Sequence, residues 1–187
     1  MRKLLRAALG LFVALDLMGL SATAALANSP HFKKGGSPTC AISGTNPISV
    51  VCTGTLAGLG GDNLEIDVTL SGFAVYQCQN GGGNTAPGQN RVLVGPSTTP
   101  TLILSSAIKN GNLTFTTNTA TLSAPATVSG SAAGCPNPNW TGVNPVVTLT
   151  NIDLDIYQPP PPPVSNRIFH CTASNSNGLS GTVSLTC

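Results

Sequence analysis

Apolar and polar residues alternate along most of the chain, most clearly in two long stretches. In residues 64–78 one face would carry Leu64, Ile66, Val68, Leu70, Ala74, Tyr76 and Cys78, and the other Glu65, Asp67, Thr69, Ser71 and Gln77. In residues 146–157, Thr148, Thr150, Ile152, Leu154 and Ile156 alternate with Leu149, Asn151, Asp153, Asp155 and Tyr157. A period of two residues predicts two half-buried β-strands. Gly72 predicts a bulge or bend that splits the first strand.

Weaker strand patterns fill the rest of the chain, and they predict the fold class. They cover residues 48–55, 91–94, 101–105, 113–121 and 127–131, with a tight-turn dipeptide at Asn110-Gly111. No segment after residue 27 keeps a helical apolar period. Several short strands with turn signals between them predict an all-β, two-sheet β-sandwich of immunoglobulin-like architecture, with a small barrel as the alternative.

The first 27 residues have the pattern of a secretory signal peptide. Arg2, Lys3 and Arg6 precede an apolar run, and Ala25 and Ala27 supply the small residues before a cleavage site at Asn28. We therefore expect a secreted, extracellular protein without a membrane span after cleavage. The remaining chain, about 160 residues, is long enough for one domain.

Six cysteines follow the leader, and an even number in an exported chain predicts three disulfides. Six cysteines can pair in many ways, and the sequence alone does not choose among them. We expect the sequential set, in which the first and last bridges clamp local hairpins and the middle one joins distant strands. The predicted pairs are Cys40–Cys52, Cys78–Cys135 and Cys171–Cys187.

Composition divides the chain after the leader into four parts. Residues 28–38 have no pattern and predict a flexible arm, and residues 39–157 form the sandwich. Residues 158–164 contain five consecutive prolines and predict an extended polyproline connector, with docking to a proline-recognising partner as the alternative. Residues 165–187 predict a last hairpin closed by a disulfide.

Charge is scarce, and this excludes several classes of partner. Only 7% of the residues are charged, against about a quarter in an average protein. After the leader, five basic residues balance five acidic ones. A neutral chain gives no counterion release against phosphate, so we expect no nucleic-acid partner. Nothing predicts self-association, and we expect a monomer.

The sequence contains no recognisable catalytic set, so we do not predict an enzyme. Ser106 and Lys109 match S-x-x-K by spacing, but they precede a turn rather than lie on a helix. His31 and His170 have no evident Ser or Asp partner. We predict no cofactor and no metal. The open alternative is a calcium ion shared by two neighbouring acidic strands, which would use Glu65, Asp67, Asn151, Asp153 and Asp155.

Two loops could bind a ligand. The Gly81-Gly82-Gly83 loop is rich in amides but lacks the lysine of a phosphate loop, so we expect an ordered loop that could hydrogen-bond a sugar or peptide. Trp140 lies in a turn-rich segment, where it could stack on a sugar ring or cap the core beside Cys135. The candidate ligand-binding residues are Asn80, Asn84, Gln89, Asn90 and Trp140.

Several short motifs resemble a group of small secreted bacterial all-β proteins of uncharacterised function. They are Ser-Pro-His-Phe at residues 29–32, Cys-Thr-Gly-Thr-Leu-Ala-Gly-Leu-Gly at 52–60, Tyr-Gln-Cys-Gln-Asn-Gly-Gly-Gly-Asn at 76–84 with Pro-Gly-Gln at 87–89, and Cys-Pro at 135–136. The resemblance implies a bacterial origin and supports a Cys78–Cys135 pair. It implies no activity, ligand or catalytic residue.

Three functions remain open from the sequence. The first is a non-enzymatic β-sandwich with a structural or general binding role at the cell exterior, whose partner would be an extracellular protein. The second is a module that binds cell-surface polysaccharide or mediates adhesion. The third is a secreted inhibitor of an enzyme.

Overall fold

The computed structural model describes residues 29–160 and 163–187 as two packed antiparallel sheets. The signal-peptide prediction, residues 1–27, lies outside the described residues. Sheet A has β3 at its centre, with β1, β2 and β12 on one side and β7 and β8 on the other. Its strands are β1 (His31–Phe32), β2 (Thr39–Ser43), β3 (Ile48–Ala57), β7 (Leu113–Thr116), β8 (Ala120–Leu122) and β12 (Thr182–Ser184).

Sheet B is built on two long strands that pair along almost their whole length. They are β4 (Leu64–Gln79) and β10 (Thr141–Tyr157). Beside them lie β5 (Thr85–Pro87), β6 (Val92–Ile103), β9 (Val128–Ser129) and β11 (Arg167–Ser174). The helical elements are single turns, η1 (Ser105–Ala107), α1 (Gly130–Ala133) and η2 (Val164–Asn166). Within the described residues none of them could span a bilayer.

The inward faces of the two sheets form the core and confirm the predicted all-β sandwich. The apolar face predicted for residues 64–78 is the buried one, from Leu64 to Cys78. From the facing sheet, Val50, Leu56 and Leu122 are also fully buried. Because successive side chains of a strand point to opposite faces, each strand contributes every second residue to this core.

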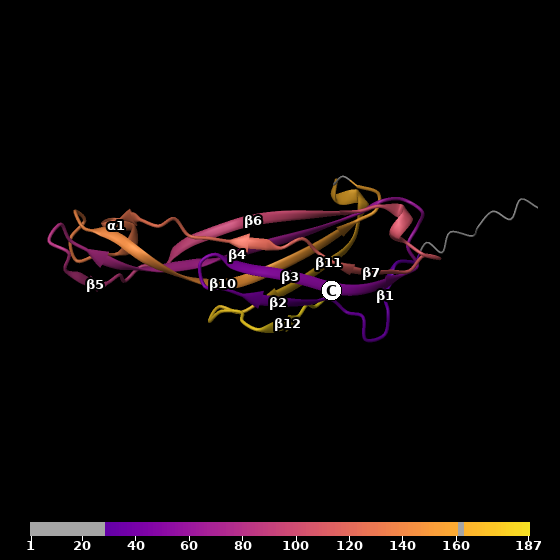
Figure 1. The fold of residues 1–187 in the computed structure, drawn as a ribbon, viewed down its shortest axis with the longest axis horizontal. Coiled ribbons are helices and arrows are strands. Elements are labelled where there is room, and N and C mark those ends of the chain that lie inside the picture. Colours follow the sequence, from indigo (N-terminus) through magenta and orange to yellow (C-terminus); the bar gives the residue numbers. More distant parts are fainter. Residues whose placement is uncertain (1–28, 161–162) are drawn as a thin grey trace, which may run out of the picture.

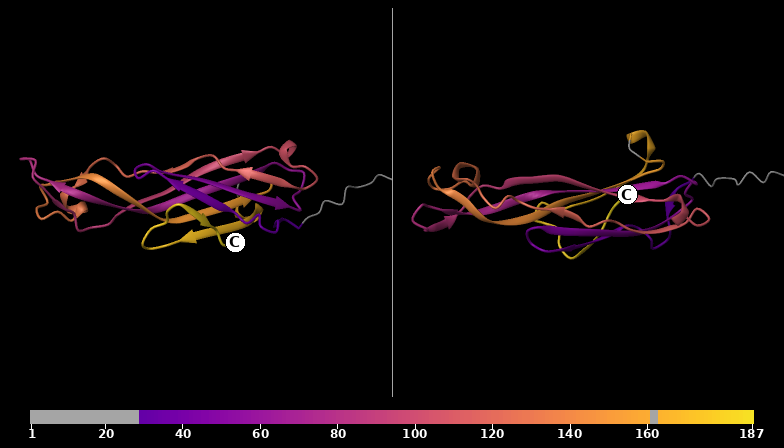
Figure 2. Two further views of the ribbon diagram at one scale, coloured as in Figure 1. Left: turned by 60° about the horizontal axis from the view of Figure 1, so that its bottom comes forward. Right: turned by 45° about the horizontal axis from the view of Figure 1, so that its top comes forward.

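Sheet B is longer than sheet A, so the molecule is elongated and one end lacks the second sheet (Figure 1). We call this end, residues 73–94 and 123–148, the extension, and the remainder the body. Figure 2 shows the two layers facing each other only in the body. In the extension the inner face of sheet B is covered by residues 123–135, and the Tyr76 hydroxyl donates to the carbonyl of Pro125 at 2.9 Å.

A change of register marks the junction between body and extension. Opposite Ser71, β10 carries one extra residue, Thr150, and β6 carries one extra residue within Gly95-Pro96. The predicted bulge therefore exists, but in the two neighbours of β4, which itself runs unbroken. The bulge also reverses the faces of β10, so that Leu149 is buried and Thr148 is not. The prediction that Thr148 shares a face with Ile152 was wrong.

The three predicted disulfides are confirmed. Cys40–Cys52 joins directly opposed residues of β2 and β3, and Cys78–Cys135 joins β4 to the loop after α1. As predicted, Cys171–Cys187 closes the last segment, beside the antiparallel bridge between Thr172 and Thr186. It joins β11 of sheet B to the end of the chain, which returns as β12 of sheet A. This bridge therefore ties the two sheets together.

The parts outside the central sandwich are attached more closely than predicted. The described part of the predicted arm, residues 29–38, is not simply loose, because His31–Phe32 pairs with β3 and the Phe32 ring centroid lies 4.6 Å from that of Phe169. Residues 161–162 of the predicted polyproline connector lie outside the described residues. The described residues on either side of them lead from β10 to β11, which pair with each other, and Gln158 N donates to Asn166 O at the base of this connection.

Four further strand predictions needed correction. The strands predicted at residues 91–94 and 101–105 are parts of one strand, β6, which covers Val92–Ile103, whereas residues 113–121 divide into β7 and β8. Residues 127–131 form a two-residue strand followed by α1. The turn at Asn110-Gly111 is confirmed, with φ of 50° and 71°, which is the left-handed region that this dipeptide tolerates.

Candidate functional site

Three of the five predicted ligand-binding residues gather at the tip of the extension. Thr141 pairs with Gln79, so Trp140 is adjacent to Asn80, and the Asn80–Asn84 loop closes the β4–β5 hairpin. The Asn80 carboxamide oxygen accepts from the backbone N–H groups of Gly82 and Asn84. That oxygen is therefore used to hold its own loop.

The other two predicted residues lie apart from the tip and bind the backbone of α1. The N–H groups of Gln89 and Asn90 both donate to the carbonyl of Ala133, and the Asn90 carboxamide donates to that of Ser131. These contacts satisfy carbonyls at the end of a helix, which is a structural role. The five residues therefore do not form one site.

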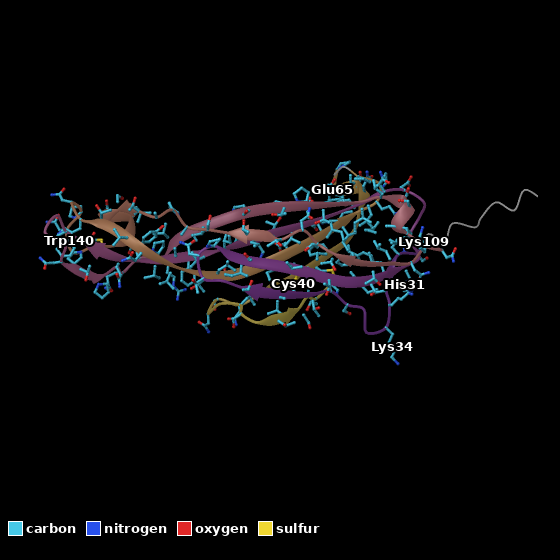
Figure 3. All side chains as sticks on the ribbon, in the orientation of Figure 1. His31, Lys34, Cys40, Glu65, Lys109 and Trp140 are labelled. Atoms are coloured by element: carbon cyan, nitrogen blue, oxygen red, sulfur yellow. A yellow bond between two sulfur atoms is a disulfide. The ribbon has the colours of Figure 1, made fainter. Side chains whose placement is uncertain are left out.

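Trp140 packs against the buried core and is partly exposed. Figure 3 places it at the far end of the extension, and its backbone N–H donates to the carbonyl of Asn137 and closes a turn. This arrangement is that of a side chain that caps the core while one part of the indole stays accessible. Both roles considered for Trp140 are compatible with this position.

A groove lies on the outer face of sheet B in the extension. It has a volume of about 370 Å³ and is lined by Val75, Gln77, Pro87, Asn144 and Val146, among others. This is within the range of small-ligand sites, roughly 300–1,000 Å³. Val75 and Val146 are directly opposed on β4 and β10, and they form an apolar floor that is 37% and 64% exposed.

A second bulge in β10 shapes one wall of this groove. One extra residue lies between Val143 and Val146, and Asn144 adopts φ of 50°, a conformation that Asn tolerates better than most residues. The Asn144 carboxamide donates to Gln77 Oε1 at 3.1 Å. This leaves the two N–H donors of Gln77 and the carboxamide oxygen of Asn144 for a ligand. Bulges often re-aim a side chain beside a binding site.

Phe73 and Arg91 lie beyond the lining of the groove, and Phe73 is the next residue after Val75 on the same face of β4. The Arg91 guanidinium carbon lies 4.2 Å from the centroid of the Phe73 ring. Leu93, directly opposite Phe73 on β6, is 87% exposed. Together with the two valines, Phe73 and Leu93 make an apolar patch on the outer face of sheet B, and such patches on a surface mark binding sites.

Sequence reasoning missed this groove, although two signals pointed to it. Phe73 and Val75 are apolar residues on the predicted polar face of residues 64–78, and Asn144-Pro145 interrupts a strand pattern. The partners of Val75 could not be read from the sequence, because they come from β5, β6 and β10 and depend on the bulges.

The acidic residues lie together on the same sheet face, but in the body. Asp67 is directly opposite Asp155, with Glu65 and Asp153 nearby in register. The two strands are thus neighbours, as the calcium hypothesis required. Among the described residues, however, no group of three or more metal-ligating side chains is placed to hold an ion. Asp155 instead accepts from Arg167 at 3.1 Å and from His170 at 2.7 Å.

Asp67 is the member of this cluster with a buried carboxylate oxygen that has no hydrogen-bond partner among the described residues. Burial, and then the charges of Glu65 and Asp155, raise the pKa of Asp67 above 3.8. The folded protein therefore holds this proton more tightly than the unfolded chain, and stability falls as pH rises from 3.8 through the folded pKa.

We therefore expect Asp67→Asn to stabilise the protein at pH 7. Like charges directly opposite in a sheet cost about 0.2–1 kcal/mol, so the free energy of unfolding should rise by that amount. Urea denaturation at pH 7 and pH 3.5 measures it, and the gain should vanish at the lower pH. Asp62→Asn, at an exposed position outside the cluster, is the control. An equal gain at both pH values would contradict the electrostatic cause.

The contact between His170 and Asp155 corrects the prediction that this histidine has no acidic partner. A histidine oriented by a carboxylate is part of many catalytic sites, which also need a nucleophile within hydrogen-bond reach. In the described part of the chain no Ser, Thr or Cys side chain hydrogen-bonds His170. Asp155 is also paired with Arg167, so this cluster is an exposed ion-pair network.

The outer face of sheet A carries hydroxyl groups in register across its strands. One row consists of Ser184, Thr39, Thr53 and Thr116, from β12, β2, β3 and β7. Further outward positions are Ser43, Ser49, Thr55, Thr114, Thr121 and Thr182. The outward side chains of these strands and β8 carry no charge.

Comparison with known proteins does not supply a family or a function for these sites. Neither the protein-family models, nor the curated proteins, nor the solved structures include a match to this chain.

Proposed function

We propose that this protein is a secreted, non-enzymatic β-sandwich that binds a partner at the cell exterior through the groove of the extension. The signal-peptide pattern supports export, and three disulfides are compatible with an oxidising extracellular environment. The observation that carries the proposal is the exposed apolar floor of Val75 and Val146 between polar walls. Exposing this surface to water is unfavourable unless a partner covers it.

The rigidity of the groove also supports a binding role. Its floor lies on the paired strands β4 and β10, and Cys78–Cys135 anchors β4 to the loop after α1 close to the groove. A site on paired strands loses little conformational entropy when a ligand binds.

Val146→Asp tests the proposal because it places a charge on the groove floor without disturbing the core. We expect the fraction of purified, oxidised protein that co-sediments with isolated bacterial envelopes to fall at least about tenfold, since an unpaired charge would be buried. Val164→Asp is the matched control, because Val164 is 67% exposed and Val146 64%. Equal retention of both variants would contradict binding through the groove.

Carbohydrate binding or adhesion is the second candidate. It is favoured by the uncharged hydroxyl face of sheet A and by the accessible part of Trp140 at the tip. The same sedimentation assay with insoluble polysaccharides distinguishes the two. Retention on a polysaccharide that is lost in Trp140→Ala and kept in Val146→Asp would favour the carbohydrate function.

A further inference from the structure

Arg91 is the only charged residue of the extension, and it lies beside the groove. The β4–β6 register pairs Ala74 with Val92, so its continuation by one residue sets Arg91 opposite Val75. Val75 in turn is opposite Val146. A single row across the sheet therefore contains one cation and the two residues of the apolar floor.

The Arg91 guanidinium carbon lies over the Phe73 ring, 4.2 Å from its centroid. A cation–π contact of this kind leaves guanidinium N–H groups available as donors. The ion pairs of the described residues involve Arg167 and His170, not Arg91. A guanidinium held beside an aromatic ring is well suited to a bidentate contact with a carboxylate.

The acidic cluster does not neutralise this site. Asp67 and Val75 are eight residues apart on the same strand, which corresponds to about 26 Å. This is well beyond the Debye length of about 8 Å at physiological ionic strength. The extension thus presents one positive charge, and a ligand with one negative charge would be complementary to it.

The order of the contacts along β4 fits an extended peptide. Arg91 and Phe73 lie at one end, Val75 and Val146 in the middle, and the Gln77–Asn144 carboxamides at the other end. From Phe73 to Gln77 is four residues, or roughly 13 Å, the length of about four residues of extended peptide. The free donors of Gln77 and the acceptor of Asn144 match the C=O and N–H of a peptide bond.

A sugar fits the same groove less well. Sugar rings bind on the open faces of aromatic side chains, but the face of Phe73 is covered by Arg91 and the Tyr76 ring is 1% exposed. Resting on the proposed groove function, we propose that its ligand is an extended peptide segment of a partner protein. This segment carries one apolar side chain for the Val75–Val146 floor and one carboxylate for Arg91.

Titration followed by NMR tests the ligand class with defined probes. The isotope-labelled, oxidised chain is titrated with N-acetyl-Gly-Ala-Val-Leu as the free acid and as the C-terminal amide. A third probe, N-acetyl-Gly-Ala-Leu-Asp amide, carries its carboxylate on a side chain. We expect amide shifts at Val75, Gln77 and Val146, and binding of the free acid about fivefold tighter than that of its amide, as one solvent-exposed ion pair allows.

Arg91→Gln should make the affinities for the free acid and the amide equal, whereas Arg91→Lys should retain part of the preference for the free acid because it keeps the charge.

A preference for the third probe over the free acid would place the carboxylate on a side chain rather than at a C-terminus, and would support the same chemistry. Equal binding of acid and amide to the unaltered chain would overturn the carboxylate inference and leave the groove function intact. No shift at the groove with any peptide, together with shifts by a uronic-acid tetrasaccharide, would overturn the peptide ligand. No shift with any probe, with Val146→Asp still retained on envelopes, would overturn the groove function itself.

Discussion

Replacing Cys78 and Cys135 together by alanine is expected to unfold the extension while the body stays folded. The bridge closes a sequence separation of 57 residues, which the chain-entropy model values at about 4 kcal/mol. Sheet A does not cover the extension (Figure 2), so few other contacts would replace the lost cross-link. Hydrogen exchange should show that the backbone amides of Ala74, Tyr76 and the substituted residue 78 lose their protection. The amides of β3 should keep theirs.

The Cys40→Ala/Cys52→Ala variant is the matched control. Its bridge joins two strands that are already paired in the body and has a sequence separation of 12, for which the same model gives about 3 kcal/mol. It should lower the stability of the body and leave binding in the groove unchanged at temperatures where the protein is folded. Unchanged protection of the extension in the Cys78→Ala/Cys135→Ala variant would show that other contacts hold it.

Gly72→Ala is expected to be the most damaging single substitution at the junction. A Cβ at this position would collide with the backbone carbonyl of Thr148 on β10. The backbone cannot move aside as a flexible side chain can, so the bulge at Thr150 would have to shift. The hydrogen bond that the Thr150 hydroxyl donates to the Ser71 carbonyl would then be lost. Overpacking of this kind costs about 1–3 kcal/mol and sometimes more, and we expect about 3 kcal/mol by urea denaturation.

Gly81→Ala separates this clash from the general cost of replacing a glycine. No atom lies within 4 Å of a Cβ at Gly81, and its φ is not in the left-handed region. The stability of this variant should therefore stay within about 0.5 kcal/mol of the unaltered protein. A Gly72→Ala variant as stable as Gly81→Ala would mean that the β4–β10 register can adjust without cost.

The elements that sequence reasoning placed correctly are those specified by local pattern. The alternation from Leu64 to Cys78 was sufficient to identify β4 and its buried face, since a strand with one buried face must repeat every two residues. The turn at Asn110-Gly111 was also local, because few residues tolerate positive φ. The alternation in β10 was misleading at Thr148, where an extra residue reverses the faces.

The candidate site was predicted only in part, because it depends on residues from different strands. Asn80 and Trp140 both lie at the tip, because they directly adjoin the paired residues Gln79 and Thr141 at the ends of β4 and β10. Gln89 and Asn90 hold α1 instead, and a four-residue helix could not be foreseen from its sequence. The groove needs Val75 from β4 and Val146 from β10, which are brought together by bulges whose positions the sequence does not state.

The sequence by itself determined the fold class, the set of cysteines that form disulfides and the near absence of charge, because these follow from local periodicity and composition. Only the tertiary structure decided that β4 and β10 extend beyond sheet A, that Val75 and Val146 form an exposed floor, and that the one charge of the extension stands beside it. Strand register is a long-range property, set by packing between distant segments and by bulges. The site therefore appears only when the strands are paired.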